Sequence, residues 1–368
     1  MKKVLFVATV TKHINSFHIP YLKWFKEEGY EVHVASNGNE QIEYCDKHYN
    51  LPFERFPLRK NNIKTYRELK KIINENKYEI IHCHTPVGGV LTRLAAKKAR
   101  KKGTRVIYTA HGFHFYKGAP LLNWLIYYPI EKWMSKYTDT LITINREDYE
   151  LAKNKFKKCK QMKLVNGVGL DTVRLDIEIS EQEQEELKKN LGIEKNNIVL
   201  TYIAEINKNK NQQLLIKTVE QLEKQGENEY VLLLVGNGKL KEIYEKYVKD
   251  KHLENNIKFL GQRNDIAKIL KITDIYVASS LREGLPVNIL EAMYMGLPLI
   301  VTNNRGHREL IENSKNGFLI NNDSKELENR IKTIVESKKL AEKFAKQNNE
   351  RIKKYLLKNI LMKMEKMY

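Results

Sequence analysis

The chain has 368 residues, of which 42% are hydrophobic, so it is long enough to form two domains with ordinary globular cores. The longest apolar runs are strand-sized and fall short of the roughly 18 residues of a membrane-spanning helix. A net charge of +20 indicates an anionic partner, such as a nucleic acid or an acidic membrane surface, or a lysine-rich background composition. The three cysteines, Cys45, Cys83 and Cys159, are isolated, which argues against a disulfide framework and favours a reducing cytosol.

The first half of the chain alternates predicted strands with predicted helices. The run after Met1 resembles a short signal segment, but residues 9–13 are polar and offer no cleavage site, so it predicts a first core strand. The predicted strands are 4–8, 31–35, 52–56, 80–83, 105–109, 140–144 and 162–165. The predicted helices are 17–28, 40–48, 63–76, 89–101, 121–136 and 146–157. Such alternation indicates a parallel sheet that is covered on both faces.

Two glycines in Val165-Asn166-Gly167-Val168-Gly169-Leu170-Asp171 interrupt this pattern, and a polar, acidic segment follows to about Asn190. We place the domain junction here, which gives an N-terminal domain of residues 1–172. The alternation then restarts. The predicted strands are 198–204, 230–235, 257–260, 275–278, 298–302 and 317–320, and the predicted helices are 211–224, 239–249, 265–271 and 307–312, with further helices from 325. The second domain is expected at 173–345, followed by a helix at 346–368.

The sequence therefore predicts an α/β protein with two doubly wound, Rossmann-like domains. In open parallel sheets, ligands bind beyond the carboxyl ends of the strands. The polar segments predicted to be loops at those ends include 9–18, 82–87, 110–118, 204–211 and 279–286. We expect the two domains to face each other across one cleft that these loops surround.

The segment from Glu283 to Met293 contains the strongest candidates for binding residues. Pro286 suits the first turn of a helix, and the amides that follow Gly284 would then form an anion site at the helix N-terminus. Glu283 lies beside that site and Glu291 about two turns further on, so both carboxylates can accept hydrogen bonds from hydroxyl groups. The segment thus fits a sugar nucleotide, although a loop–helix junction with two solvated glutamates is the plainer alternative.

With these motifs the chain resembles the retaining family-4 glycosyltransferases of the GT-B fold, over nearly its whole length. The resemblance rests on Glu283-Gly284-Leu285-Pro286 with Glu291-Ala292-Met293, Asn166-Gly167-Val168 with Asp171, Val235-Gly236-Asn237-Gly238, Gly296-Leu297-Pro298 and Gly306 with Glu309. The segments Ser16-Phe17-His18-Ile19-Pro20 and Thr109-Ala110-His111-Gly112-Phe113-His114-Phe115 resemble bacterial enzymes that build capsular or exopolysaccharide repeat units.

The resemblance implies how a nucleotide sugar is held. Glu291 would bind the ribose hydroxyls, and Glu283 with the backbone of Gly284, Leu285, Pro286 and Val287 would hold the transferred sugar. The backbone around Arg263 would contact the base, and the turn at Gly236 and Asn237 would lie near the nucleotide. Lys210 would neutralise the diphosphate, and His111 would contact the transferred sugar. The resemblance also implies a final helix that crosses back to the N-terminal domain, and a retaining reaction without a metal.

Two departures from the family pattern concern substrate binding. The family has an arginine shortly before the lysine, whereas this chain has Glu205, so we expect Lys208, Arg305 or Arg308 to supply the missing cation. Many relatives carry paired glycines in the first loop, whereas this chain has Thr9 to Ser16. The acceptor-binding candidates are His13, Asn15, Ser16 and His114.

The pairs His82-x-His84 and His111-x-x-His114 raise the question of a metal site, but no acidic or cysteine partner completes either pair. We therefore predict no metal and no cofactor, since the nucleotide sugar is a substrate. Residues 117–133 are rich in Trp, Tyr and Leu, which fits either an interfacial helix at lipid headgroups or a core helix. The basic clusters 97–102 and 153–163 favour contact with an anionic membrane.

We expect a glycosyltransferase at the cytoplasmic face of the cell membrane that moves a sugar, an N-acetylhexosamine, from a UDP donor to a saccharide on undecaprenyl diphosphate. One alternative is a UDP-sugar epimerase or hydrolase on the same fold. Another is a basic nucleic-acid-binding protein, although the sequence shows no aromatic-basic motif for nucleic acid. The sequence gives no prediction of oligomeric state.

Overall fold

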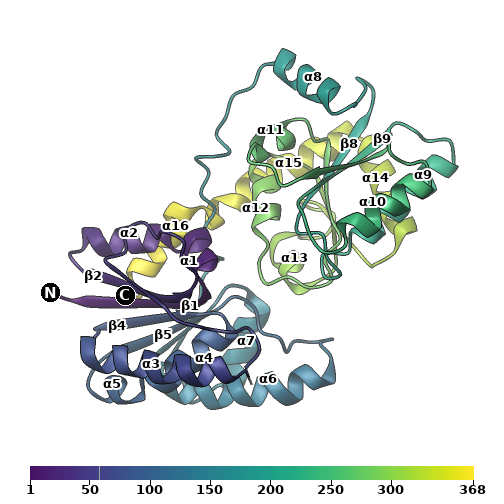
Figure 1. Cartoon of the computed structure of the whole chain (residues 1–368). Helices are drawn as coiled ribbons and strands as arrows, with labels where there is room; N and C mark the ends of the chain where they lie inside the picture. Colours follow the sequence, from purple (N-terminus) through teal and green to yellow (C-terminus); the bar gives the residue numbers. More distant parts are fainter. Residues whose placement is uncertain (58) are drawn as a thin grey trace. The chain divides into compact units, whose positions relative to one another are not determined.

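The computed structural model describes residues 1–57 and 59–368, which form two compact units (Figure 1). The first unit contains residues 1–169 and 358–368, and the second contains residues 170–357. The last eleven residues thus belong to the N-terminal unit.

The first unit is a seven-stranded parallel sheet in the order β3-β2-β1-β4-β5-β6-β7. Its strands are β1 (Lys3–Val10), β2 (Glu31–Asn37), β3 (Lys47–Asn50), β4 (Ile80–His84), β5 (Arg105–Ala110), β6 (Thr140–Thr143) and β7 (Gln161–Leu164). Its helices are α1 (Thr11–Phe17), α2 (Ile19–Glu27), α3 (Lys60–Asn76), α4 (Pro86–Ala95), α5 (Lys97–Lys101), α6 (Leu121–Met134), α7 (Arg146–Lys155) and α16 (Leu357–Glu365).

Strand β1 shows why both faces of this sheet are covered. Its side chains alternate between two apolar clusters, because successive residues of a strand point to opposite faces. Leu5 and Val7 join one cluster with residues of α3 and α4, whereas Val4 and Phe6 join the other with residues of α2 and α16. A strand buried on both faces reads as a continuous apolar run, as this one does.

The second unit is a six-stranded parallel sheet in the order β10-β9-β8-β11-β12-β13. Its strands are β8 (Ile198–Ile203), β9 (Tyr230–Val235), β10 (Ile257–Gly261), β11 (Ile275–Ala278), β12 (Leu299–Thr302) and β13 (Phe318–Ile320). Its helices are α8 (Glu181–Asn190), α9 (Gln212–Lys224), α10 (Lys241–Asp250), α11 (Ile266–Lys271), α12 (Val287–Tyr294), α13 (Arg305–Leu310), α14 (Ser324–Val335) and α15 (Lys338–Ile352). Both units therefore have the predicted parallel α/β architecture.

The C-terminal segment packs into the first unit through α16. Ile360 and Met364 are buried in the apolar cluster that contains Phe6, and the Tyr368 hydroxyl lies 2.7 Å from His82 Nδ1. The prediction of one helix over 346–368 is wrong in detail. Helix α15 ends at Ile352, and a 3₁₀ turn (Lys353–Tyr355) separates it from α16.

Other predictions of local structure are also wrong. Residues 9–18 are not a loop, because β1 continues to Val10 and α1 follows directly. Residues 40–48 are not helical, since they contain turns and the start of β3, and residues 52–56 form no strand. Helix α8 lies in the segment assigned to the junction, where Ser180 and Glu183 form a capping box.

In the part of the chain that the structure describes, no helix has the length and apolarity to cross a membrane.

Candidate active site

Glu283 in the second unit is held by a short ion pair and a close backbone contact. Lys210 Nζ lies 2.5 Å from Glu283 Oε1, and both side chains are largely buried. Lys210 precedes α9, whereas Glu283 lies between β11 and α12, so the pair joins the ends of two neighbouring strands, β8 and β11. A Cβ at Gly306 would lie 2.7 Å from the Glu283 Cβ, which is closer than real atoms approach. The glycine at 306 therefore lets α13 pack directly against the Glu283 loop.

Glu291 lies on α12, which begins at Val287 directly after Pro286, as predicted. Its side chain is buried and pairs with Arg174, whose own side chain is mostly exposed. Burial raises the pKa of Glu291, and the Arg174 guanidinium opposes that rise. The plainer alternative of two solvated glutamates is therefore wrong, since Glu291 is only 4% exposed.

The loop that carries Glu205 and Lys208 is fastened to the glycine turn after β9. The Ile206 amide donates to the Asn237 carbonyl at 2.9 Å, and a Cβ at Gly238 would lie 2.2 Å from the Ile206 carbonyl oxygen. The glycines of this turn thus allow two strand-end loops to approach each other. Glu205 and Lys208 are both exposed, so neither side chain packs in the core.

The three arginines near these loops have different surroundings. Arg263 forms a two-bond contact with Asp265, at 2.8 and 2.6 Å. Arg305 is buried and donates from Nε to the Glu283 carbonyl at 3.2 Å, whereas Arg308 is exposed and bonds Asn303. Arg305 thus supports the Glu283 loop through its backbone. Of the three cations that we expected to replace the family arginine, Lys208 and Arg308 are exposed.

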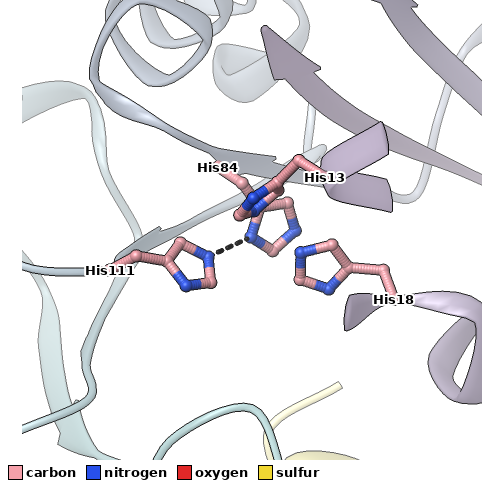
Figure 2. A group of neighbouring side chains, drawn as sticks. All are labelled: His13, His18, His84 and His111. Atoms are coloured by element: carbon pink, nitrogen blue, oxygen red, sulfur yellow. Dashed lines mark hydrogen bonds between the residues drawn. The ribbon is translucent and has the colours of Figure 1, made fainter. Parts of the chain in front are cut away.

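Figure 2 shows four imidazoles gathered in the first unit: His13 from α1, His18 from the α1–α2 junction, His84 from the end of β4, and His111 directly after β5. One ring nitrogen of each lies within 4.8 Å of the others. His111 Nε2 and His84 Nδ1 are 3.3 Å apart (Figure 2). Burial lowers the pKa of His13 to about 4 and holds the pKa values of the other three well below the usual value, so all four rings are neutral at pH 7.

The remaining acceptor candidates lie nearby in the same unit. The Asn15 side-chain amide donates to the Gln41 carbonyl at 2.9 Å, and Ser16 is exposed at the end of α1. The His114 ring stacks on Tyr127 with centroids 4.6 Å apart. His13 and His114 line a cavity of about 390 Å³ together with Arg55, Tyr127 and Glu131. The structure therefore places two of the four acceptor candidates on one cavity.

Two site residues were not predicted. Arg174 pairs with Glu291 across more than a hundred residues of sequence, and only the position of Arg174 near the junction could have drawn attention to it. His18 was part of a quoted motif, but its role went unnoticed because the sequence does not show that the ends of β1, β4 and β5 lie side by side.

Comparisons with known proteins agree with this fold. A family model described as "Glycosyl transferases group 1" matches residues 183–351, and one described as "Glycosyl transferase 4-like" matches residues 3–145. The chain is 45% identical over 350 residues to the putative glycosyltransferase EpsD of Bacillus subtilis, which covers 95% of this chain and 91% of that protein. The chain is a group 1 glycosyltransferase. This membership selects a transferase over the epimerase, hydrolase and nucleic-acid-binding alternatives.

A second relative of this group 1 glycosyltransferase is the Escherichia coli UDP-Gal:alpha-D-GlcNAc-diphosphoundecaprenol alpha-1,3-galactosyltransferase. It is 32% identical over 284 residues, which cover 76% of this chain and 72% of that enzyme. Among solved structures, Anabaena HepE in complex with UDP and glucose superposes with a TM-score of 0.80 at 20% identity, over 100% of this chain and 99% of that one. That similarity confirms the predicted GT-B fold.

Proposed function

We propose that this glycosyltransferase moves an N-acetylhexosamine from a UDP-sugar to a saccharide carried on undecaprenyl diphosphate, with retention of anomeric configuration. The observation that carries the proposal is the Lys210–Glu283 pair, held at 2.5 Å beside the start of α12. The pair offers a cation for phosphate and a carboxylate for sugar hydroxyls at one point. The start of α12 next to it adds backbone N–H groups for a further anionic or polar group.

Each residue of this set has a distinct role in the proposal. Glu291 binds the ribose hydroxyls, because its buried carboxylate is fixed on a rigid helix. Lys210 neutralises the diphosphate, so the donor needs no metal there, and Lys208 or Arg308 adds a second cation. Glu283 and the backbone of residues 284–287 orient the transferred sugar. His111 contacts that sugar through a ring N–H, and the leaving phosphate oxygen helps to deprotonate the acceptor.

The acceptor side of the proposal rests on the first unit. The cavity beside His13 and His114 has polar walls at Arg55 and Glu131 and an otherwise mostly apolar lining, which fits a saccharide joined to a lipid. The E. coli relative is named for a diphosphoundecaprenol acceptor, and this cavity offers an arginine for a diphosphate of that class.

The proposal includes contact with an anionic membrane through α6. One face of this helix packs Trp124 and Tyr128 against the core, so neither reading of residues 117–133 describes the whole helix. The other face exposes Leu121, Leu122 and Leu125, which are 73%, 63% and 65% exposed. Near the C-terminal end of the helix, Lys97 and Lys136 lie over the ring of Trp133. Exposed leucines, an aromatic ring and lysines together fit an interfacial helix.

A donor panel tests the enzymatic proposal. Thermal unfolding is measured with UDP, GDP and ADP, and transfer is then measured with UDP-N-acetylglucosamine and UDP-N-acetylgalactosamine on a synthetic undecaprenyl diphosphate disaccharide. We expect UDP alone among the nucleotides to raise the unfolding midpoint, and one UDP-sugar to give product. Stabilisation by GDP or ADP in place of UDP would contradict the proposed donor.

Vesicle sedimentation tests the membrane contact. The triple variant Leu121→Ser, Leu122→Ser, Leu125→Ser should lose binding to vesicles of anionic phospholipid at low salt. The matched control is Ile243→Ser, because Ile243 is 61% exposed on α10 of the other unit. Equal sedimentation of the triple variant and the wild type would contradict a role for α6.

A further inference from the structure

We propose that His13, His18, His84 and His111 form a binding site for one late first-row transition-metal ion, with Zn²⁺ the best fit. The site goes beyond the proposed transfer reaction, which gives His111 a contact to the sugar, places His13 beside the acceptor cavity and assigns no metal. It also revises the sequence-based prediction of no metal. That prediction paired His84 with His82, and His111 with His114, whereas the structure brings His84 and His111 together with two histidines from other segments.

The spacing of the nitrogens suits a tetrahedral ion. Zinc binds imidazole nitrogen at about 2.05 Å in a tetrahedral arrangement, which places neighbouring ligand nitrogens about 3.3 Å apart. His111 Nε2 and His84 Nδ1 are already 3.3 Å apart. A typical N–H hydrogen bond is shorter, with about 2.9–3.0 Å between the donor and acceptor atoms. The ligand nitrogens all lie within 4.8 Å of one another, so the side chains would have to rotate inward to bring all four to about 2.05 Å from one ion.

The unsatisfied nitrogens of the cluster point to a missing ligand. Among the described residues, 1–57 and 59–368, the Nε2 atoms of His13, His18 and His84 are buried and have no hydrogen-bond partner. Those of His13 and His18 are candidate ligand atoms, whereas the ligand atom of His84 is its Nδ1, which faces His111. His18 and His84 are only 3% and 0% exposed. Buried polar atoms without a partner are costly, and in native proteins each calls for a ligand, an ion or a water.

His82 provides the contrast within the same strand. It lies two residues before His84, on the same face of β4, and its ring is also buried. Its Nδ1 lies 2.7 Å from the Tyr368 hydroxyl, and its Nε2 lies 2.8 Å from Thr109 Oγ1. Both nitrogens of this structural histidine are therefore satisfied by the protein, whereas the Nε2 atoms of His13, His18 and His84 are not.

A small void borders the cluster. It measures about 20 Å³, and His18, His84 and His111 line it together with Tyr21 and Thr109. A void of about 10–15 Å³ or more can hold one water. The void therefore has room for a water or an ion beside three of the four histidines, whereas His13 does not line it. His13 and His111 are only partly buried.

The ligand type narrows the choice of ion. Imidazole suits Zn²⁺, Cu²⁺, Ni²⁺ and Fe²⁺, whereas Mg²⁺ and Ca²⁺ require oxygen ligands. An ion at this place would tie together α1, the α1–α2 junction and the ends of β4 and β5. Coordination through His111 Nε2 leaves its Nδ1 free to carry the N–H that the proposed function requires. The ion would thus fix the direction of that donor.

Metal content of the tag-free full-length protein tests the site directly. After incubation with Zn²⁺ and extensive dialysis, we expect one zinc per chain by elemental analysis. Co²⁺ should give the intense visible absorption of a tetrahedral site. Zn²⁺ should also raise the unfolding midpoint of the first unit by about 5 °C, whereas Mg²⁺ should not.

Variants locate the ion. His13→Ala and the double variant His18→Ala, His84→Ala should lose the zinc and the cobalt absorption. His48→Gln should keep both, because His48 lies outside the cluster and its Nε2 already bonds Ser36 Oγ at 2.9 Å. The wild-type measurements stand even if a buried-histidine variant fails to fold. Less than a tenth of a zinc per chain, with no cobalt spectrum and no thermal shift, would overturn the proposal, as would zinc that survives in His13→Ala at full occupancy. Each readout is taken without a nucleotide sugar, so it is independent of the proposed transfer reaction.

Discussion

Replacing Glu291 by alanine should weaken the binding of UDP without unfolding the protein. Glu291 is 4% exposed, and among the described residues its carboxylate forms an ion pair with Arg174, whose side chain is 62% exposed. Without Glu291, the Arg174 guanidinium is solvated by water. The substitution also removes the cost of burying a charged carboxylate, the same cost that raises the pKa of Glu291. The stability of the second unit should change little as a result.

The expected loss in UDP affinity follows from the hydrogen bonds to ribose. A hydrogen bond to a charged group contributes about 1.5–3 kcal/mol, so losing about 2 kcal/mol raises the dissociation constant about 30-fold. Glu291→Gln keeps the side-chain shape and an acceptor oxygen but loses the charge, so its loss of UDP affinity should be smaller than that of Glu291→Ala. The matched control is Glu220→Ala, because Glu220 is also a buried glutamate of the second unit, bonded to Lys224 and Tyr247 at 2.7 and 2.6 Å.

Isothermal titration calorimetry with UDP and 2′,3′-dideoxy-UDP isolates the contact. The wild type and Glu220→Ala should bind the dideoxy analogue more weakly than UDP, whereas Glu291→Ala should bind the two equally. If Glu291→Ala still distinguished UDP from the analogue as the wild type does, Glu291 would not be the ribose ligand, and the assignment would be refuted.

Three further predictions concern neighbouring residues. Glu283→Gln should lower kcat with the intact UDP-sugar by about 100-fold while leaving the calorimetric Kd for UDP within about threefold, since its carboxylate is assigned to the sugar; a large loss of UDP affinity with normal turnover would reverse the roles of Glu283 and Glu291. Lys208→Ala should weaken UDP binding about threefold and uridine binding not at all, because an exposed contact to the diphosphate is screened by solvent; unchanged UDP affinity would leave Arg308 as the replacement cation. Burial lowers the pKa of His307 to about 4, so the unfolded state binds a proton that the folded state does not as the pH falls from about 6.5 to about 4. Between pH 7 and pH 5 the wild type should therefore lose about 2 kcal/mol more of its free energy of unfolding than His307→Gln does, as measured by urea titration. Equal losses in the two proteins would show that His307 is not the titrating group.

The alternation of strands and helices could be predicted because buried parallel strands are continuous apolar runs, of which β1 and β9 are clear examples. The helix at α8 could also have been predicted from the Ser180–Glu183 capping box, but its acidic composition favoured a linker. Residues 40–48 have helical spacing in sequence, yet the chain must return beside β2 to pair β3 there, and that pairing overrides local propensity.

The two parts of the candidate site differed in how far the sequence reveals them. Glu283, Gly284 and Glu291 lie within one loop and helix, so their arrangement follows from local rules for helix starts. The four-histidine cluster depends on which strands are neighbours. His13 and His18 follow β1, His84 ends β4 and His111 follows β5, and these meet because the sheet order is β1-β4-β5. That order is a property of the whole fold and is not encoded in any one motif.

The anomeric configuration of the product tests the central claim most directly. The protein is incubated with a UDP-N-acetylhexosamine labelled with ¹³C at C1 of the sugar and with a short-chain polyprenyl diphosphate disaccharide, and the one-bond carbon–proton coupling of the new linkage is read by NMR. The α-linked donor should give an α-linked trisaccharide and an equal amount of UDP. A β-linked product, or release of UDP with free sugar and no trisaccharide, would contradict a retaining transferase that acts on a lipid-linked saccharide.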